Sequence, residues 1–174
     1  MKTRLLANLC AFALCVAIFS ATIFGAIFFV ACDGEKVAEI GKIAPEIVAM
    51  DMEGKSANLV DFSDKAIALV FFKNGCEACV GILPPLDSYA KTAPNLAVIA
   101  INAHNSKDEI AEFLAEVSLP HTQILRDSLK LTTQRFIITM TPSVVLLDRN
   151  HIVREKIIGA GDFGAIEAKL QTLL

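Results

Sequence analysis

Apolar and polar residues are distributed so that the chain divides into two regions. Residues 5–31 contain no charged side chain, whereas the rest of the chain shows short apolar runs between polar turns. Runs at 66–72, 96–101, 143–147 and 152–158 predict strands, and shorter strands are predicted at 46–50, 56–60 and 123–125. The first two in the chain, 46–50 and 56–60, flank a turn at Glu53-Gly54 and are expected to pair as a hairpin.

Helices are predicted between these strands, at 77–91, 128–136 and 163–173 and after Ser106. Ser106 and Glu109 have the spacing of a capping box, and apolar residues follow them at helical spacing. Pro84-Pro85 should kink or restart the helix at 77–91 because proline lacks a backbone N–H. Asp162 is the expected N-cap of the last helix. The order of the elements, ββ then βαβα then ββα, predicts an α/β domain.

The uncharged segment at 5–31 is long enough to span a bilayer, which takes about 20 residues. Lys2 and Arg4 precede it, and basic flanks stay in the cytoplasm, so the rest of the chain is expected outside the cytoplasm. Phe29-Val30-Ala31-Cys32 also resembles a bacterial lipobox, in which Cys32 would be lipidated. A retained transmembrane helix and a lipoprotein both remain open, and both tether the protein to the bacterial cytoplasmic membrane, with its domain on the periplasmic or other extracytoplasmic side.

These features divide the chain into an anchor or signal segment at 1–31, a linker at 32–44 and one folded domain at 45–174. The 174 residues include 16 Lys and Arg against 19 Asp and Glu, with no basic cluster. Nucleic acid is therefore not expected as a partner, because phosphate backbones are bound by clustered positive charge.

Cys76-Glu77-Ala78-Cys79 carries the candidate chemistry. The motif follows the apolar run at 66–72 and opens a predicted helix, where unpaired N–H groups stabilise a thiolate on Cys76. Cys79 lies about one helical turn further on, so its sulfur can close a disulfide with Cys76 or attack a mixed disulfide formed there. The two residues are predicted to form a redox-active pair, with Cys76 as the nucleophile.

Three other uses of the motif compete with this interpretation. A structural disulfide that closes so short a loop adds only about 2 kcal/mol. A zinc site needs two more ligands, and the other cysteines, Cys10, Cys15 and Cys32, lie in or beside the N-terminal apolar segment. Haem attachment requires a histidine directly after the second cysteine, where this chain has Val80. No metal and no other cofactor is expected.

Four features together resemble the thioredoxin superfamily, in particular its membrane-anchored TlpA/ResA type: a strand, a Cys-x-x-Cys at a helix start, a proline in that helix, and Thr141-Pro142 opening a strand hairpin. The resemblance covers about residues 43–174. It implies a thioredoxin-like fold, with a central mixed sheet flanked by helices, an N-terminal β-hairpin and an extra inserted helix. It also implies that Pro142 is cis beside the disulfide and that Thr141 binds substrate backbone. The alternative for Pro142 is an ordinary loop proline at a strand start.

The chain departs from that family at several positions. Gly75 stands where tryptophan is usual, and Val70 and Ile82 stand where members of the family have carboxylates that accept a proton. Glu77 can take a proton from the second cysteine through water, and Lys73 can stabilise a thiolate on the first. These two residues are candidate modulators of the pair.

The resemblance implies an extracytoplasmic thiol–disulfide oxidoreductase that reduces disulfides of exported proteins. Apocytochrome c is one candidate substrate, and a membrane electron donor is expected to regenerate the dithiol. A copper-binding chaperone of thioredoxin fold is the main alternative, because such a protein pairs two cysteines with a distant histidine, here His121. The three histidines are otherwise expected to be solvated polar residues.

Overall fold

Strand β2 (Ala66–Phe72) lies at the centre of the sheet, and all seven of its residues are buried. It pairs parallel to β3 (Leu96–Asn102) on one side and antiparallel to β5 (Ser143–Leu147) on the other. A strand covered on both faces has continuous apolar sequence, which is why these runs show no polar alternation. The computed structural model, which describes residues 36–159 and 161–174, confirms the strands predicted for these three runs.

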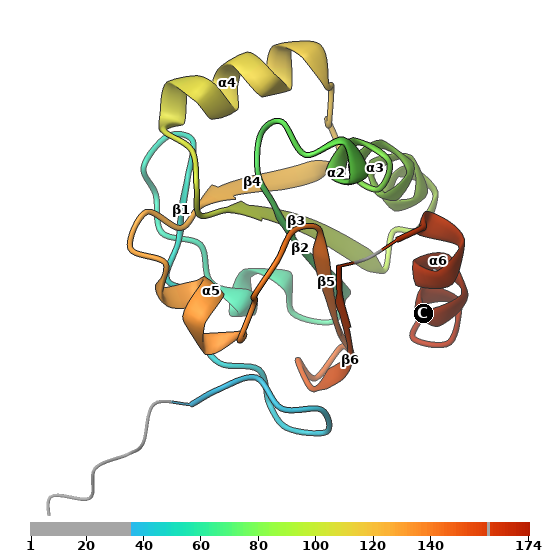
Figure 1. Ribbon diagram of the computed structural model, residues 1–174. Helices are drawn as coiled ribbons and strands as arrows, with labels where there is room; N and C mark the ends of the chain where they lie inside the picture. Colours follow the sequence, from blue (N-terminus) through green and yellow to red (C-terminus); the bar gives the residue numbers. More distant parts are fainter. Residues whose placement is uncertain (1–35, 160) are drawn as a thin grey trace, which may run out of the picture. The chain divides into compact units, whose positions relative to one another are not determined.

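Three further strands complete a six-stranded mixed sheet in the order β1-β4-β3-β2-β5-β6 (Figure 1); they are β1 (Met50–Asp51), β4 (Thr122–Arg126) and β6 (Val153–Ile158). Strand β4 runs parallel to β3. The outer strands β1 and β6 are each antiparallel to their neighbour. The register pairs Phe72 with Asn102 and Phe71 with Ser143. The ends of β2 and β3 and the start of β5 therefore meet at one end of the strands. This end of the sheet is here called the carboxyl edge.

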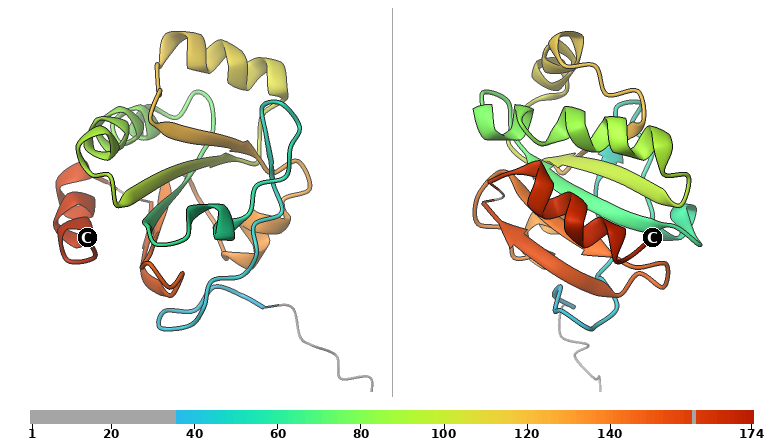
Figure 2. Two further views of the ribbon diagram at one scale, coloured as in Figure 1. Left: turned by 180° about the vertical axis from the view of Figure 1, so that it is seen from behind. Right: turned by 90° about the vertical axis from the view of Figure 1, so that its right-hand side faces the viewer.

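The two faces of the sheet carry separate cores. Even-numbered residues of β2 pack with α3 (Leu83–Thr92), α6 (Phe163–Gln171) and Phe113 of α4 (Lys107–Glu116). Odd-numbered residues pack with apolar residues between positions 38 and 59 and with Phe136, which follows α5 (Leu131–Arg135). Figures 1 and 2 show α3 and α6 on one side of the sheet and α5 on the other. The fold is thus an α/β sandwich of the thioredoxin-like type.

The helix predicted at 77–91 is two helices. Helix α2 (Glu77–Val80) ends before Gly81 and Ile82, and α3 begins at Leu83. Pro84 and Pro85 lie in the first turn of α3, where a missing N–H breaks no helical bond. The restart predicted from these prolines is confirmed.

The predicted helix caps are also present. Glu109 N–H donates to Ser106 Oγ at 3.3 Å, and Ser106 N–H donates to the Glu109 carboxylate at 2.6 Å. Gly164 N–H donates to Asp162 Oδ1 at 2.6 Å at the start of α6. Helix α5 is shorter than the predicted span of 128–136, because Lys130 lies in the left-handed region and the helix begins only after it.

The predicted N-terminal hairpin is reduced to β1 and one bridge between Met50 and Ser56. The expected strand at 56–60 is wrong beyond Ser56, where the chain enters a 3₁₀ helix at Leu59–Phe62. Asn58 Oδ1 accepts from Val60 N–H at 3.4 Å, and the Asp61 carboxylate accepts from Asn58 N–H at 3.3 Å. These local bonds offer the backbone an alternative to strand pairing.

The folded unit begins before residue 45. Within the predicted linker at 32–44, Ala38 N–H donates to Arg135 O at 2.8 Å, and Ile43 bridges Ile152 of the C-terminal hairpin. No helix in the described part of the chain is long and apolar enough to cross a membrane. The predicted anchor at 1–31 and Cys32 lie outside the described residues.

Candidate active site

The chain leaves β2 at the carboxyl edge and reaches a disulfide between Cys76 and Cys79, whose Cα atoms are 5.2 Å apart. Cys76 is the N-cap of α2 and is partly exposed, whereas Cys79 is fully buried in the core under α3. Another protein can therefore reach the sulfur of Cys76 but not that of Cys79. This asymmetry agrees with the assignment of Cys76 as the nucleophile.

Backbone geometry around Cys76 places a hydrogen-bond donor at its sulfur. Cys79 N–H donates to Cys76 Sγ at 3.2 Å, as expected for a residue that caps a helix start. Gly75 precedes it with φ +69°, and an added Cβ would meet nothing within 4 Å. The left-handed backbone, not lack of space, explains why glycine occupies this position.

Three asparagines, here called the asparagine clasp, hold this loop to the end of β3. The buried side chain of Asn102 donates through Nδ2 to Asn74 Oδ1 at 3.3 Å and to Asn105 Oδ1 at 3.2 Å. Asn74 N–H donates to Asn105 Oδ1 at 3.0 Å. Asn102 Oδ1 also accepts from the N–H groups of His104 and Asn105, both at 2.9 Å. The clasp fixes the loop two residues before Cys76.

The peptide bond between Thr141 and Pro142 is cis, and Pro142 is buried directly before β5. Because Ser143 pairs with Phe71, the two preceding residues lie at the carboxyl edge near the loop to Cys76. Ser143 Oγ donates to Met140 O at 2.7 Å and accepts from Gly159 N–H at 3.4 Å, which ties this segment to the turn after β6. The cis bond implied by the family resemblance is confirmed, and the binding role of Thr141 remains a prediction.

The buried sulfur of Cys79 lies in apolar surroundings. Val70 and Ile82 are both buried and belong to the same core. Two carboxylates are buried within the described residues, and both serve other elements: Asp87 accepts from His121 N–H at 2.8 Å, and Asp127 accepts from Thr133. Glu77, the sequence candidate for proton transfer, is exposed at the start of α2, so no buried carboxylate of the described part replaces the family's usual proton acceptor.

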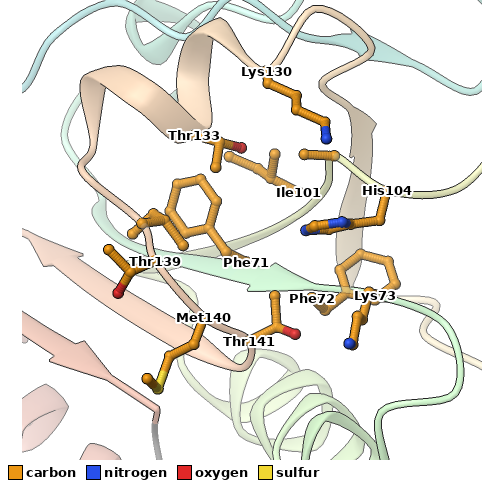
Figure 3. Close-up of a pocket in the computed structure, with 12 residues that line it drawn as sticks. Phe71, Phe72, Lys73, Ile101, His104, Lys130, Thr133, Thr139, Met140 and Thr141 are labelled. Atoms are coloured by element: carbon orange, nitrogen blue, oxygen red, sulfur yellow. The ribbon is translucent and has the colours of Figure 1, made fainter.

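A pocket of about 440 Å³ opens beside this edge (Figure 3). Its apolar floor comes from strand ends and from the segment before Thr141, and its polar lining comes from threonines and three basic side chains. The lining residues are Phe71, Phe72, Lys73, Ile101, Ala103, His104, Lys130, Thr133, Ile138, Thr139, Met140 and Thr141. Lys73 and Thr141, both named from the sequence, are thus brought to one cavity, although the cysteines do not line it.

The basic side chains of this pocket interact with one another. The pKa of His104 is lowered, first by partial burial and then by the positive charges of Lys130 and Lys73. Protonated His104 is therefore less stable here than in water, and the imidazole is held neutral to lower pH.

The histidine proposed for copper lies far from the disulfide. His121 directly precedes β4, whose first residue pairs with Val98 near the beginning of β3, so it lies at the opposite edge of the sheet from Cys76. Among the described residues, no group of three or more His, Cys, Asp or Glu side chains forms a metal site. The sequence alternative that joined Cys76, Cys79 and His121 is not supported by this geometry.

The clasp, Lys130 and the position of His104 are not among the predictions from the sequence. These residues come from the loops after β2, β3 and β4, and only the strand register brings them together. The available signal was the position of Asn74, Asn102 and His104 just beyond predicted strands, because parallel strands bring such residues to one edge.

A buried central strand, a Cys-x-x-Cys pair at the following helix and a cis-proline before the adjoining strand define a thioredoxin-like oxidoreductase. Residues 40–156 match the AhpC/TSA family, and the chain belongs to that family.

Curated relatives agree with this class, and a solved structure shares the fold. The thiol-disulfide oxidoreductase ResA of Bacillus cereus is 29% identical over 143 residues, covering 81% of this chain and 82% of the relative. ResA of Geobacillus thermodenitrificans is 25% identical over 144 residues, covering 80% and 81%. The thioredoxin domain of a thiol-disulfide oxidoreductase from Bacteroides vulgatus superposes with a TM-score of 0.64 at 20% identity, covering 76% of this chain and 97% of that one.

The clasp generates a prediction about the loop. Replacing Asn102 with alanine should lower the free energy of unfolding by about 2 kcal/mol, because the N–H groups of His104 and Asn105 lose their acceptor in a partly buried site. Amide hydrogen exchange at Asn74 should accelerate more than exchange within β2. Asn150→Ala, in an exposed turn, is the matched control and should change stability by less than about 0.5 kcal/mol. Equal exchange at Asn74 in the Asn102 variant and the parent would show that the clasp does not hold the loop.

Proposed function

We propose that this protein reduces disulfide bonds in exported proteins on the extracytoplasmic side of a bacterial membrane. The observation that carries the proposal is the unequal exposure of the two sulfurs: Cys76 is accessible and bonded by a helix N–H, and Cys79 is buried one turn inside. A reductant needs one sulfur that meets the substrate and a second that resolves the intermediate.

The exchange proceeds in two steps from the dithiol form. The Cys76 thiolate attacks a substrate disulfide, forms a mixed disulfide and expels one substrate thiolate, which takes up a proton. Cys79 then loses its proton and attacks Cys76, which releases the second substrate thiol and closes the Cys76–Cys79 bond. Two electrons pass from the dithiol to the substrate, and a dithiol electron donor in the membrane must return them.

Cys76 reactivity is favoured by its position. The Cys79 N–H that reaches Cys76 Sγ at 3.2 Å is a donor that stabilises negative charge on that sulfur. Exposed Lys73, three residues earlier, adds positive charge, whereas Glu77 opposes it. Proton loss from Cys79 requires water or Glu77, because its described surroundings are apolar.

The substrate class is a folded or nascent exported protein that carries a disulfide, and apocytochrome c is one candidate. Pro142 supports recognition of an extended substrate segment, because a proline offers no N–H of its own that would compete for the substrate backbone. Thr141 would then bond the substrate backbone next to its cysteine.

Location on the membrane rests on the N-terminal sequence. The uncharged segment at 5–31 after Lys2 and Arg4 supports a tether with the domain outside the cytoplasm. A transmembrane helix and a lipid on Cys32 are the two forms that this tether can take.

Division of labour between the sulfurs can be tested with single serine variants of the full-length chain in detergent. Cys76→Ser should abolish reduction of a protein disulfide, because no accessible sulfur remains. Cys79→Ser should accumulate mixed disulfides between Cys76 and substrates, detectable on non-reducing gels, because the resolving sulfur is gone.

Ala78→Ser, an exposed change between the two cysteines, is the matched control and should keep the parental rate. Parental turnover by Cys79→Ser, or alkylation of Cys79 before Cys76, would contradict the assignment.

Topology provides a separate test. A reporter fused after Leu174 should be active only in the version that works outside the cytoplasm. Cys32→Ala should remove lipid label and processing if Cys32 is lipidated and should leave both unchanged if a helix spans the membrane, with Cys15→Ala as the control. Activity of a cytoplasmic reporter would disprove the proposed orientation.

A further inference from the structure

We propose that the pocket beside the disulfide binds an acidic side chain of the substrate, within one or two residues of the cysteine that Cys76 attacks. The inference rests on the proposed thiol–disulfide exchange and adds a charge preference to it. It concerns three basic residues, Lys73, His104 and Lys130, here called the basic wall.

The pocket shares two segments of the chain with the candidate active site: the loop that leads from β2 to Cys76 and the residue before Pro142. One lining residue, Lys73, lies three positions before Cys76 on the loop that the asparagine clasp holds. Another, Thr141, is the residue joined to Pro142 by the cis bond. A substrate strand advances about 3.3 Å per residue, and the proposal places the acidic side chain one or two such steps from the attacked cysteine.

The basic wall is assembled from three separate parts of the chain. Lys73 follows β2, His104 follows β3, and Lys130 caps the start of α5. Figure 3 shows them along one side of the pocket, with Thr139, Met140 and Thr141 on another side. No carboxylate is among the described residues that line the pocket, and neither lysine forms an ion pair within the described part of the chain.

This local charge differs from that of the whole molecule. The full chain has a formal net charge of −3, so a long-range field would repel an acidic substrate. Attraction of a carboxylate must therefore come from the basic wall itself, at short range. Lys130 and Lys73 both lower the pKa of His104, after the larger effect of its partial burial, so the two lysines supply the positive charge and His104 stays neutral to lower pH.

The backbone around Lys130, one residue of the basic wall, is fixed by its surroundings. Lys130 and Ile137, on either side of α5, both have left-handed backbone conformations, with φ +57° and +53°. Such a conformation is rare for lysine and rarer for a β-branched residue, and it persists only where the surrounding structure imposes it. Thr133 within α5 donates from both N and Oγ1 to Asp127 Oδ2 at 2.7 Å. The backbone that carries Lys130 is thus fixed before any substrate arrives.

The remaining lining suits the methylene groups of an acidic side chain. Ile101 and Ile138 line the pocket together with exposed Met140. Met140 lies against Gly159, where an added Cβ would stand 2.7 Å from the methionine sulfur. A glutamate fits this combination, with its methylenes on the apolar lining and its carboxylate toward the basic wall.

A series of peptides tests the proposal. Disulfide-linked homodimers of one short peptide carry Glu, Gln or Lys beside the cysteine, and the reduced full-length protein in detergent reacts with each in a single turnover. The reaction converts the protein dithiol to its disulfide and each peptide dimer to two thiols, and acid quenching followed by chromatography gives the second-order rate constant. Hydroxyethyl disulfide, which is small and uncharged, reports the intrinsic reactivity of the dithiol.

The Glu peptide should react about tenfold faster than the Lys peptide, with the Gln peptide between them. Lys130→Glu combined with His104→Gln should remove or reverse that order while leaving the rate with hydroxyethyl disulfide within about twofold. Lys65→Glu is the matched control: Lys65 is exposed and precedes β2 at the opposite edge of the sheet, and this variant should keep the preference.

Equal rates with all three peptides, or a preference that survives the Lys130→Glu/His104→Gln variant, would overturn the pocket assignment. Loss of preference in Lys65→Glu as well would overturn it too, because the effect would then follow net charge. Failure of the parent protein to react even with hydroxyethyl disulfide would instead reject the proposed exchange activity, and the two failures are therefore distinguishable.

Discussion

The site depends on one constraint, the complete burial of β2. All seven residues are buried, β3 and β5 pair with the strand on its two sides, and separate cores cover its two faces. The strand cannot slip by one residue without exchanging its two faces between different cores. The point at which the chain emerges is consequently fixed, and the cysteine four residues later is delivered to one place.

The loop after β2 positions Cys76 for reaction. The asparagine clasp restrains Asn74, a left-handed Gly75 turns the chain, and Cys76 caps the next helix. One sulfur remains accessible while the other enters the core. A rigid support matters because exchange requires three sulfur atoms in line, and loosely held reacting groups lose rate.

Features encoded locally could be predicted from the sequence, and features assembled from distant segments could not. The run at 66–72, the capping box of Ser106 and Glu109, and the Cys-x-x-Cys pair each lie within one short segment, and the structure contains all three. The predicted hairpin at 46–60 is mostly absent because Asn58 and Asp61 form a capping box that starts a 3₁₀ helix. The basic wall escaped prediction for a different reason, since its residues lie in three loops that only the parallel register brings together.

Pro142 lies between these cases. Its cis bond followed from the family resemblance and is present in the structure, yet its relation to the loop before Cys76 depends on the pairing of Ser143 with Phe71. Val70 and Ile82 stand where the family usually places carboxylates, so neither position can accept the proton of Cys79. The chain thus keeps the family's cis-proline but lacks its usual proton acceptors. The reduction potential of the Cys76–Cys79 pair is therefore the property that decides between reductant and oxidant.

The reduction potential of the Cys76–Cys79 couple tests the central claim most directly. The full-length protein is equilibrated with redox buffers of dithiothreitol or glutathione, and the fraction of dithiol is counted by alkylation and mass measurement. A protein that reduces exported disulfides should have a potential near the thioredoxin end of the range, about −270 mV. A value near −120 mV, typical of a strong oxidant, or a pair that never exchanges with either buffer, would contradict it.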